Sequence, residues 1–302
     1  MAGRAGLVLG VLLAGLANPA AAQEPRTHSL ARPDGSRLSF HLDRPGPSGR
    51  RPLLLVLQGS GCDPVGPDAR VNSYGRMLAP GYVRLTIEKY GVATGGEPLI
   101  EGCTAAFWRG NTLSRRVADA VQVIAHLRGA PWWNGELVVF GGSEGGAVAA
   151  MAAPLLPETR AVIIWSSGIG VPVGSLIRAA IPPEAAGQAE AVFAEARANP
   201  SGDRRWGGAS YAWWADAVDM VPARSLLEVR APILVIHGSR DQFALVATAR
   251  ATRDLLAGAG RRNFTYREYA GYDHFMVDAA GADHRGAVLA ETARWLRGLP
   301  GR

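Results

Sequence analysis

Short apolar runs alternate along this chain with longer segments in which apolar residues recur at helical spacing. An unbroken apolar run of about four to eight residues is typical of a strand buried on both faces of a parallel sheet. Strands are predicted at 52–57, 82–87, 137–140, 161–165, 233–237 and 264–269. Helices are predicted at 112–128, 244–257 and 282–297. The alternation of the two patterns indicates an α/β fold with a mostly parallel sheet.

Two segments depart from this alternation. Residues 27–42 predict a β-hairpin, because two strand-like runs flank a Pro-Asp-Gly turn at 33–35, and this hairpin would add an antiparallel edge to the sheet. Residues 166–230 form a long segment rich in Ala, Pro and Trp that exceeds an ordinary connection between a helix and a strand. We expect that segment to be a helical cap insertion over the sheet, with ordinary peripheral helices as the alternative.

The first 22 residues have the features of a signal peptide. Arg4 supplies a positive charge, residues 7–16 form an apolar run too short to cross a bilayer, and alanines at 20–22 suit a cleavage site before Gln23. No later stretch is apolar and long enough to span a membrane. We expect residues 1–22 to be removed and the protein to be exported, either periplasmic or secreted, without stable membrane insertion. An uncleaved membrane anchor is the alternative.

Composition narrows the class of protein further. Of the 302 residues, 48% are hydrophobic and 19% are charged, which excludes a disordered chain. The 38 glycines and 20 prolines follow no collagen-like period. The formal net charge is +6, but the arginines are scattered, and Lys89 is the only lysine among the 32 basic residues. Because the basic residues form no stripe, no nucleic-acid partner is expected.

The strongest chemical signal is the sequence Gly-Gly-Ser-Glu-Gly-Gly at 141–146. It follows the predicted strand 137–140 and precedes an alanine-rich helical run at 147–155, which is the context of a nucleophile elbow. Glycines are needed there because a side chain beside the strained turn would collide with backbone. Ser143 is therefore the candidate nucleophile. The alternative is a glycine-rich turn without chemistry, or one that binds phosphate, but the chain has no Gly-Lys-Ser/Thr Walker sequence.

A nucleophilic serine needs a base, and three of the six histidines precede Ser143, which is the wrong order for this kind of site. His274 lies a few residues after the predicted strand 264–269, at the sheet edge where open α/β folds keep their sites. His284 lies near the start of the last helix and is expected at the surface, and His237 ends a strand and is expected to be structural. His274 is therefore the candidate base.

The acid that orients this base should follow the preceding strand. Asp241 lies in a Gly-x-x-Asp loop directly after the predicted strand 233–237. Its carboxylate would fix the imidazole tautomer and stabilise the imidazolium. Asp273 is adjacent to His274 in the sequence and is therefore badly placed to face its ring. Asp241 is the candidate acid, and a merely solvent-exposed Asp241 is the alternative.

An oxyanion hole needs two aimed backbone N–H donors. One is expected at Glu144, directly after the nucleophile, and the other at Ser60, in the glycine-rich loop after the strand 52–57. The only two cysteines are Cys62 and Cys103. Outside the cytoplasm such a pair tends to bridge, so a disulfide is predicted, with two free thiols as the alternative. The bridge would brace the loop that carries Ser60.

These residues carry a resemblance to the α/β-hydrolase superfamily over about residues 27–298. It rests on four matches in order: the loop 58–61, the elbow 141–146, the loop 238–241, and His274. The doubled glycine after the elbow is similar to the prolyl-oligopeptidase and dienelactone-hydrolase side of the superfamily. One departure is that many relatives have His-Gly where this chain has Gln58-Gly59. Because the donor is a backbone N–H, the oxyanion hole is expected to survive that change.

The resemblance implies one α/β-hydrolase domain over residues 23–302. Together with the predicted signal peptide and triad, it leads us to expect an exported serine hydrolase that cleaves a carboxylic ester through an acyl-enzyme, with no metal or cofactor; the resemblance itself does not specify the substrate. The substrate would be a small-molecule ester or a short peptide, in a pocket shaped by the segment 166–230. Two alternatives stay open: a serine peptidase or amidase acting on short peptides, and a non-catalytic binding protein that uses the same fold.

Overall fold

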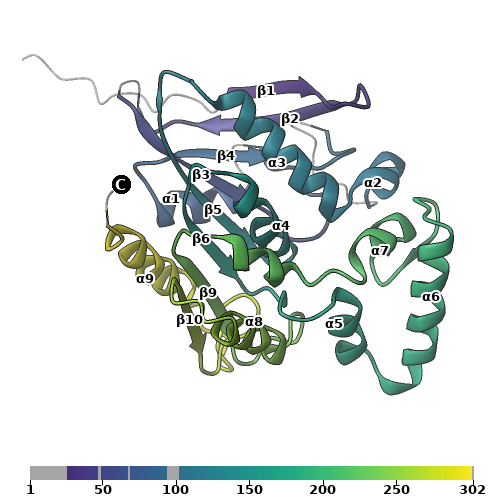
Figure 1. Cartoon of the computed structure of the whole chain (residues 1–302). Helices are drawn as coiled ribbons and strands as arrows, with labels where there is room; N and C mark the ends of the chain where they lie inside the picture. The colour runs from purple at the N-terminus through teal and green to yellow at the C-terminus, as the bar shows by residue number, and fades with distance from the viewer. Residues whose placement is uncertain (1–25, 47–48, 67–68, 94–101, 301–302) are drawn as a thin grey trace, which may run out of the picture.

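Eight strands form one sheet in the order β1-β2-β4-β3-β5-β6-β9-β10 (Figure 1). The strands are β1 Arg26–Ala31, β2 Arg37–Asp43, β3 Arg51–Leu57, β4 Val83–Ile87, β5 Trp133–Gly142, β6 Thr159–Trp165, β9 Ile233–Gly238 and β10 Phe264–Tyr269. Pairing is parallel from β4 to β10, and β1 and β2 are antiparallel at one edge. The carboxyl ends of the parallel strands therefore meet at one edge of the sheet, where the predicted site residues follow them.

The structure is a computed structural model that describes residues 26–300, apart from 47–48, 67–68 and 94–101. The predicted signal peptide over 1–22, with its cleavage site, lies outside the described residues. The predicted hairpin and all six predicted central strands are present. These results confirm the α/β-hydrolase fold with its antiparallel N-terminal edge.

Helices cover both faces of the sheet. They are α1 Arg70–Leu78, α2 Ala105–Gly110, α3 Leu113–Leu127, α4 Glu144–Ala152, α8 Val246–Gly258 and α9 Arg285–Arg297. One apolar core joins the sheet to α3, α4 and α8, and a second core on the opposite face joins it to α1 and α9. Strands β3, β5, β6 and β9 contribute side chains to both cores, which explains their unbroken apolar runs.

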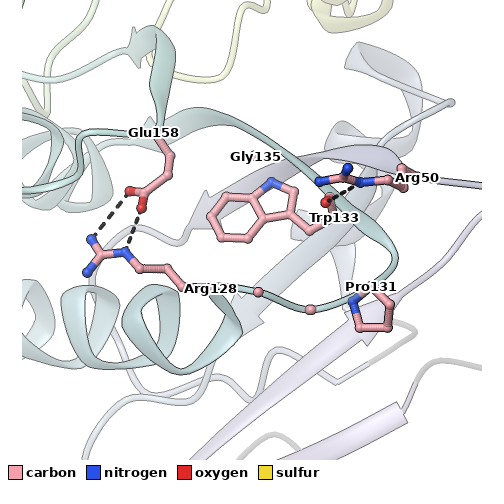
Figure 2. Close-up of a pocket in the computed structure, with 8 residues that line it drawn as sticks. Arg50, Arg128, Pro131, Trp133, Gly135 and Glu158 are labelled. Carbon is pink, nitrogen blue, oxygen red and sulfur yellow. Dashed lines mark hydrogen bonds and ion pairs between the residues drawn. The ribbon is translucent and has the colours of Figure 1, made fainter.

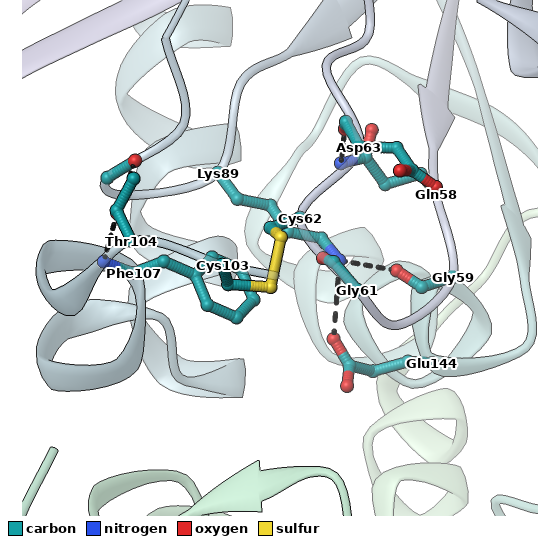
Figure 3. The surroundings of a disulfide bond; sticks show 11 residues. Gln58, Gly59, Gly61, Cys62, Asp63, Lys89, Cys103, Thr104, Phe107 and Glu144 are labelled. Atoms are coloured by element: carbon teal, nitrogen blue, oxygen red, sulfur yellow. Dashed lines mark hydrogen bonds and ion pairs between the residues drawn. A yellow bond between two sulfur atoms is a disulfide. The ribbon is translucent and has the colours of Figure 1, made fainter. Parts of the chain in front are cut away.

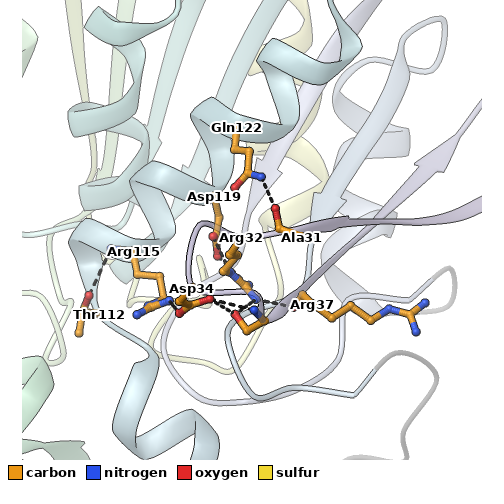
Figure 4. Close-up of polar contacts among 9 residues, drawn as sticks. Ala31, Arg32, Asp34, Arg37, Thr112, Arg115, Asp119 and Gln122 are labelled. Carbon is orange, nitrogen blue, oxygen red and sulfur yellow. Dashed lines mark hydrogen bonds and ion pairs between the residues drawn. The ribbon is translucent and has the colours of Figure 1, made fainter.

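The hairpin is held to α3 by buried and half-buried ion pairs (Figure 4). Arg32, just after β1, donates from Nε and Nη2 to the two carboxylate oxygens of Asp119 on α3, at 2.7 and 2.9 Å. One turn earlier on the helix, Arg115 donates to Asp34 in the hairpin turn at 2.7 Å. A bidentate arginine–carboxylate pair is both strong and directional, so it fixes the antiparallel edge against the helix.

The segment 166–230 lies between β6 and β9 and is mainly helical. It contains α5 Val173–Ala180, η2 Pro183–Ala185, α6 Ala186–Ala198, β7 Arg205–Trp206, β8 Ala209–Ser210, α7 Tyr211–Ala217 and η3 Pro222–Glu228. Figure 1 shows α5, α6 and α7 beside the sheet, with α7 near α2. Trp214 is 1% exposed and packs against Trp206, Trp213 and Phe193. Much of the tryptophan content therefore forms the core of the segment itself.

Candidate active site

Ser143 occupies a strained turn between β5 and α4. Its backbone has φ 52° and ψ −127°, which L-residues rarely adopt. A Cβ at Gly141 would lie 2.1 Å from the carbonyl oxygen of Gly145, and one at Gly145 would lie 2.1 Å from that of Leu57. Both positions therefore require glycine. Helix α4 begins at Glu144, so the N–H of Glu144 lies at a helix N-terminus, where N–H groups have no intrahelical acceptor.

Asp241 and His274 meet at the carboxyl ends of β9 and β10. The Nδ1 of His274 lies 2.8 Å from Oδ2 of Asp241, and the other carboxylate oxygen accepts the backbone N–H groups of Phe243 and Ala244 at 2.9 and 2.8 Å. Asp241 is 2% exposed. An ionised carboxylate at that position accepts the Nδ1 proton, which leaves Nε2 of His274 as the basic nitrogen.

A second histidine touches the same carboxylate. The Nε2 of His237 lies 3.3 Å from Oδ2 of Asp241 and donates to the carbonyl of Ala244 at 2.6 Å. Burial lowers the pKa of His237 below its ordinary value, although the charge of Asp241 opposes that shift. His237 is therefore neutral near pH 7. A neutral His237 packs against the Asp241 carboxylate and does not compete with the His274 imidazolium for its negative charge.

Asp273 and His284, the alternative acid and base, make other contacts in the structure. The Oδ1 of Asp273 accepts the backbone N–H groups of Phe275 and Val277, so it shapes the loop around His274. His284 is half-buried just before α9, where it pairs with Asp278 at 2.8 Å and stacks on Tyr272. In the described part of the chain, neither side chain forms a hydrogen bond or ion pair with Asp241 or Ser143.

A cavity of about 320 Å³ has both Ser143 and His274 in its wall. Its other lining residues are mostly apolar or aromatic, and include Phe140, Trp165, Phe275 and Leu289. A larger pocket of about 500 Å³ lies beside the β3 and β5 amino ends, between Arg50, Arg128 and Glu158 (Figure 2). None of the predicted site residues lines that larger pocket, so the smaller cavity is the candidate active site.

The loop after β3 lies directly against the elbow. A Cβ placed on Gly59 would be 3.2 Å from the Cβ of Ser143, so the backbone of Gly59 touches the nucleophile candidate. Ser60 is exposed and lines a small neighbouring pocket together with Glu144 and Trp213 of α7. The structure therefore places both predicted oxyanion donors beside one pocket, and part of the segment 166–230 reaches it. Their role as donors stays a prediction.

Cys62 and Cys103 form a disulfide, as the sequence predicts (Figure 3). The bond joins the loop after β3 to the residue before Thr104, whose Oγ1 caps α2 by accepting the Phe107 N–H at 3.0 Å. The loop 58–61, which carries the predicted oxyanion donor Ser60 and is called the oxyanion loop below, is therefore tied to the start of a helix.

Two buried cations that the sequence pattern did not predict, Lys89 and Arg116, lie beneath this loop. Lys89 follows β4 and is 3% exposed, and its Nζ donates to the carbonyls of Gly59 and Gly61 at 2.5 and 2.6 Å. Arg116 of α3 is 7% exposed and donates to the carbonyl of Gln58 and to Glu144, both at 2.6 Å. The only sign of Lys89 in the sequence is that the single lysine of the chain follows the predicted strand 82–87 closely.

The described residues contain neither a metal-binding cluster of side chains nor a membrane-spanning helix. Within the described residues, no group of three or more His, Cys, Asp or Glu side chains is arranged to hold a metal ion. Likewise, no helix in the described part of the chain is long and apolar enough to cross a bilayer.

The fold and the elbow serine define an α/β-hydrolase-fold serine hydrolase. The sequence model of the prolyl oligopeptidase family matches residues 105–299, which is more than half of the chain, so the protein belongs to that family. That range contains Ser143, Asp241 and His274. The model of the X-Pro dipeptidyl-peptidase (S15) family matches residues 34–172, which include the oxyanion loop and the elbow. A comparison with curated proteins gave no match.

Solved structures share this fold at low identity. Est1E from Butyrivibrio proteoclasticus, with ferulic acid bound, is 16% identical with a TM-score of 0.61; 89% of this chain and 98% of that one are covered. A puromycin-hydrolysing peptidase from Mycobacterium tuberculosis is 17% identical with a TM-score of 0.60, covering 93% and 40%. A protein described as a dipeptidyl aminopeptidase IV from Bacteroides ovatus is 16% identical with a TM-score of 0.62, covering 92% and 36%. This chain thus spans less than half of either peptidase.

Proposed function

We propose that this serine hydrolase cleaves a carboxylic ester and that Ser143, His274 and Asp241 are its catalytic triad. The observation that carries the proposal is the 2.8 Å bond between His274 Nδ1 and Asp241 Oδ2, in a histidine that shares a cavity with the elbow serine. A serine hydroxyl is a weak nucleophile until a base takes its proton, and a base oriented by a buried carboxylate meets that need.

In the proposed reaction, Oγ of Ser143 attacks the ester carbonyl carbon while Nε2 of His274 takes its proton. The carbonyl oxygen becomes an oxyanion that accepts hydrogen bonds from the N–H groups of Ser60 and Glu144. The intermediate collapses, the C–O bond to the alcohol breaks, and the imidazolium of His274 protonates the leaving oxygen. Water then attacks the acyl-enzyme by the same proton transfers and releases the acid.

Three features of the structure and one comparison support an uncharged substrate with an apolar or aromatic part. The cavity wall is largely apolar. Two exposed aromatic rings, Phe243 at 68% and Phe275 at 48%, flank His274 with ring centroids 5.3 and 5.1 Å from its own. The cavity-lining Arg285 is already bonded to Asp283. Est1E, whose fold is similar, binds ferulic acid, which is an aromatic carboxylic acid.

A labelling experiment tests the nucleophile. A fluorophosphonate probe should react with the wild-type protein at Ser143, and Ser143→Ala should lose both labelling and about 10⁴-fold or more in kcat while staying folded. Ser175→Ala, on α5 away from the cavity, is the matched control and should retain both. An active Ser143→Ala protein that labels at another serine would contradict the assignment.

A peptidase or amidase is the second candidate function. The family membership supports it. So does Asp63, whose exposed carboxylate-bearing side chain lines the cavity edge, where it would suit an amino group of a peptide. The two functions are separated by a panel of p-nitrophenyl esters and aminoacyl arylamides. Higher kcat/KM on the arylamides would assign the peptidase activity, and the opposite order would assign the esterase.

We further propose that the protein is exported. Arg4, the apolar run at 7–16 and the alanines at 20–22 support a cleaved signal peptide. The disulfide between Cys62 and Cys103 also supports an oxidising compartment. Cell fractionation followed by N-terminal sequencing tests this proposal: mature protein starting near Gln23 outside the cytoplasm is expected, and a full-length cytoplasmic protein would contradict it.

A further inference from the structure

Lys89 and Arg116 lie beneath the oxyanion loop and take no part in the proposed triad. Burying a cation costs free energy unless it is paired and hydrogen-bonded. Among the described residues, Glu144 is the only carboxylate within ion-pair distance of either one: its Oε1 lies 3.9 Å from Lys89 Nζ and 2.6 Å from Arg116 Nη1. Two cations thus share one carboxylate, and their remaining recorded hydrogen bonds go to backbone carbonyls of the loop.

Those bonds hold three of the four carbonyls between Gln58 and Gly61. Arg116 holds that of Gln58, and Lys89 holds those of Gly59 and Gly61 on either side of Ser60 (Figure 3). A charged donor makes shorter and stronger bonds than a neutral one. A single side chain therefore holds the peptide unit that precedes Ser60 and the one that follows Gly61.

The bond from Lys89 to the Gly59 carbonyl also fixes the direction of the Ser60 N–H, because both groups belong to one planar peptide unit. In a trans peptide the C=O and the N–H point in opposite directions, and the described chain has no cis bond. Because the Gly59 carbonyl points to the buried Lys89, the Ser60 N–H in the same peptide unit points away from it. Ser60 is exposed, and the backbone of the preceding residue, Gly59, touches Ser143, so this N–H belongs to a peptide unit beside the elbow and points away from the buried cation.

Lys89 also places a positive charge beneath the loop that carries Ser60. While Lys89 is protonated, two cations and one carboxylate leave a net charge of about +1 below the loop, in a buried setting where Coulomb interactions are strong. Phe107 of α2 closes the site, with its ring 6.0 Å from Nζ. Burial, followed by the charge of Arg116, lowers the pKa of Lys89 to about 7, against the opposing charges of Glu144 and Asp63. Lys89 therefore changes charge near neutral pH.

We propose that Lys89 is the positioning residue of the oxyanion hole: its bonds to Gly59 and Gly61 present the Ser60 N–H to the oxyanion, and its charge stabilises that oxyanion. This inference rests on the proposed function, because it needs Ser143 as nucleophile and Ser60 as donor. An oxyanion donor acts mainly in the transition state, so its misalignment lowers kcat more than it raises KM.

The test replaces Lys89 by methionine, which keeps an unbranched side chain of nearly the same length and removes its charge and donors. Loss of a whole oxyanion donor costs about 10²–10³ in kcat, so a misaimed one should cost about 10–100-fold with KM within about twofold. The inhibition constant of an aryl trifluoromethyl ketone, which forms an oxyanion on the serine, should rise by a similar factor. Arg160→Met is the matched control: Arg160 also donates to a backbone carbonyl, that of Leu299, but lies on β6 away from the cavity. Its kcat should stay within about twofold.

The pH profile gives a readout that a merely structural lysine would not move. Wild-type kcat should fall as the pH rises from 7 to 9, because Lys89 loses its charge, whereas Lys89→Met should show no such fall, so the two curves approach each other. Parallel curves would overturn the proposal. If Lys89→Met does not fold, the wild-type profile alone decides, and a kcat that is constant from pH 7.5 to 10 would overturn it.

Failure of this inference is distinguishable from failure of the proposed function. A wild-type protein that neither labels with fluorophosphonate nor hydrolyses any ester or arylamide would overturn the proposed function and this inference with it. A wild-type protein that does both, with a folded Lys89→Met variant of equal kcat and equal inhibition constant, would overturn the role of Lys89 alone.

Discussion

Removing the disulfide should separate its effect on stability from its effect on catalysis. The bond closes a loop with a sequence separation of 41 residues. In the chain-entropy model a loop of this length stabilises the native state by about 4 kcal/mol at 25 °C. The entropy of unfolding for a chain of this size is roughly 0.6 kcal/mol/K near the midpoint, so Cys62→Ala/Cys103→Ala should lower Tm by about 7 °C. Far-UV circular dichroism measures this shift.

Reductant supplies the control for this prediction. Dithiothreitol should lower the Tm of the wild-type protein toward that of the double variant and leave the double variant unchanged. Well below its Tm, the variant should lose turnover rather than affinity, because Cys62 follows the loop that carries Ser60. A Tm change under about 2 °C would refute the stability argument, and an unchanged kcat would reduce the bond to a structural role.

Three further predictions concern the triad, the ring of Phe243 beside His274, and Lys89. Asp241→Asn should lower kcat by about 10³–10⁴, because an amide would favour the wrong tautomer of His274; near-wild-type turnover would refute the assignment of the acid. Phe243→Ala should raise KM for aryl esters by about 3–10-fold at unchanged kcat, whereas the similarly exposed Leu155→Ala should change neither. Lys89 has a folded pKa of about 7 against 10.5 for an ordinary lysine, so the unfolded chain binds more protons between these values. The free energy of unfolding should therefore rise with pH in that window, by up to about 1.4 kcal/mol per pH unit relative to Lys89→Met, as urea denaturation would measure; a constant difference would contradict this.

The central strands were predictable because they are buried on both faces, and their sequences are therefore continuously apolar. The start of β5 was not predictable in the same way. The strand begins at Trp133, four residues before the apolar run at 137–140, because Trp133 pairs with Arg51 of β3, and the register then shifts before pairing resumes at Leu137. Helices α1 and α2 were also not predicted. Each is short, and α2 depends on a cap from Thr104 and on packing that local periodicity does not reveal.

The meeting of Asp241 and His274 was predictable for a topological reason. Each residue follows a parallel strand, and the carboxyl ends of neighbouring parallel strands lie at one edge of a sheet. The contacts of Lys89 with Gly59 and Gly61 had no such signal. They join residues 30 and 28 positions apart through a side chain and two carbonyls, and every residue has a carbonyl, so the sequence does not mark which ones are used.

Arg115 and Arg116 of α3 are a second case in which the sequence does not reveal the contacts of a side chain. In the sequence they are an isolated basic pair, and nothing in it indicates that the two side chains have different surroundings. Successive residues on a helix are separated by about 100°, so one neighbour can face outward while the other faces the core. Arg115 accordingly pairs with Asp34 in the hairpin turn (Figure 4), whereas Arg116 is buried and reaches the oxyanion loop.

The restraints on the oxyanion loop come from separate parts of the chain, and this separation has a functional reason. Cys103 holds the loop by a covalent bond, Lys89 holds two of its carbonyls, and Arg116 holds a third. Donors stabilise a transition state without reorganisation only if they are already aimed when the substrate arrives. A glycine-rich loop such as 58–61 cannot keep such an aim alone, because glycine gives the backbone the most conformational freedom. The same glycines that let the loop approach Ser143 therefore require supports from outside it, and a buried lysine supplies one of them.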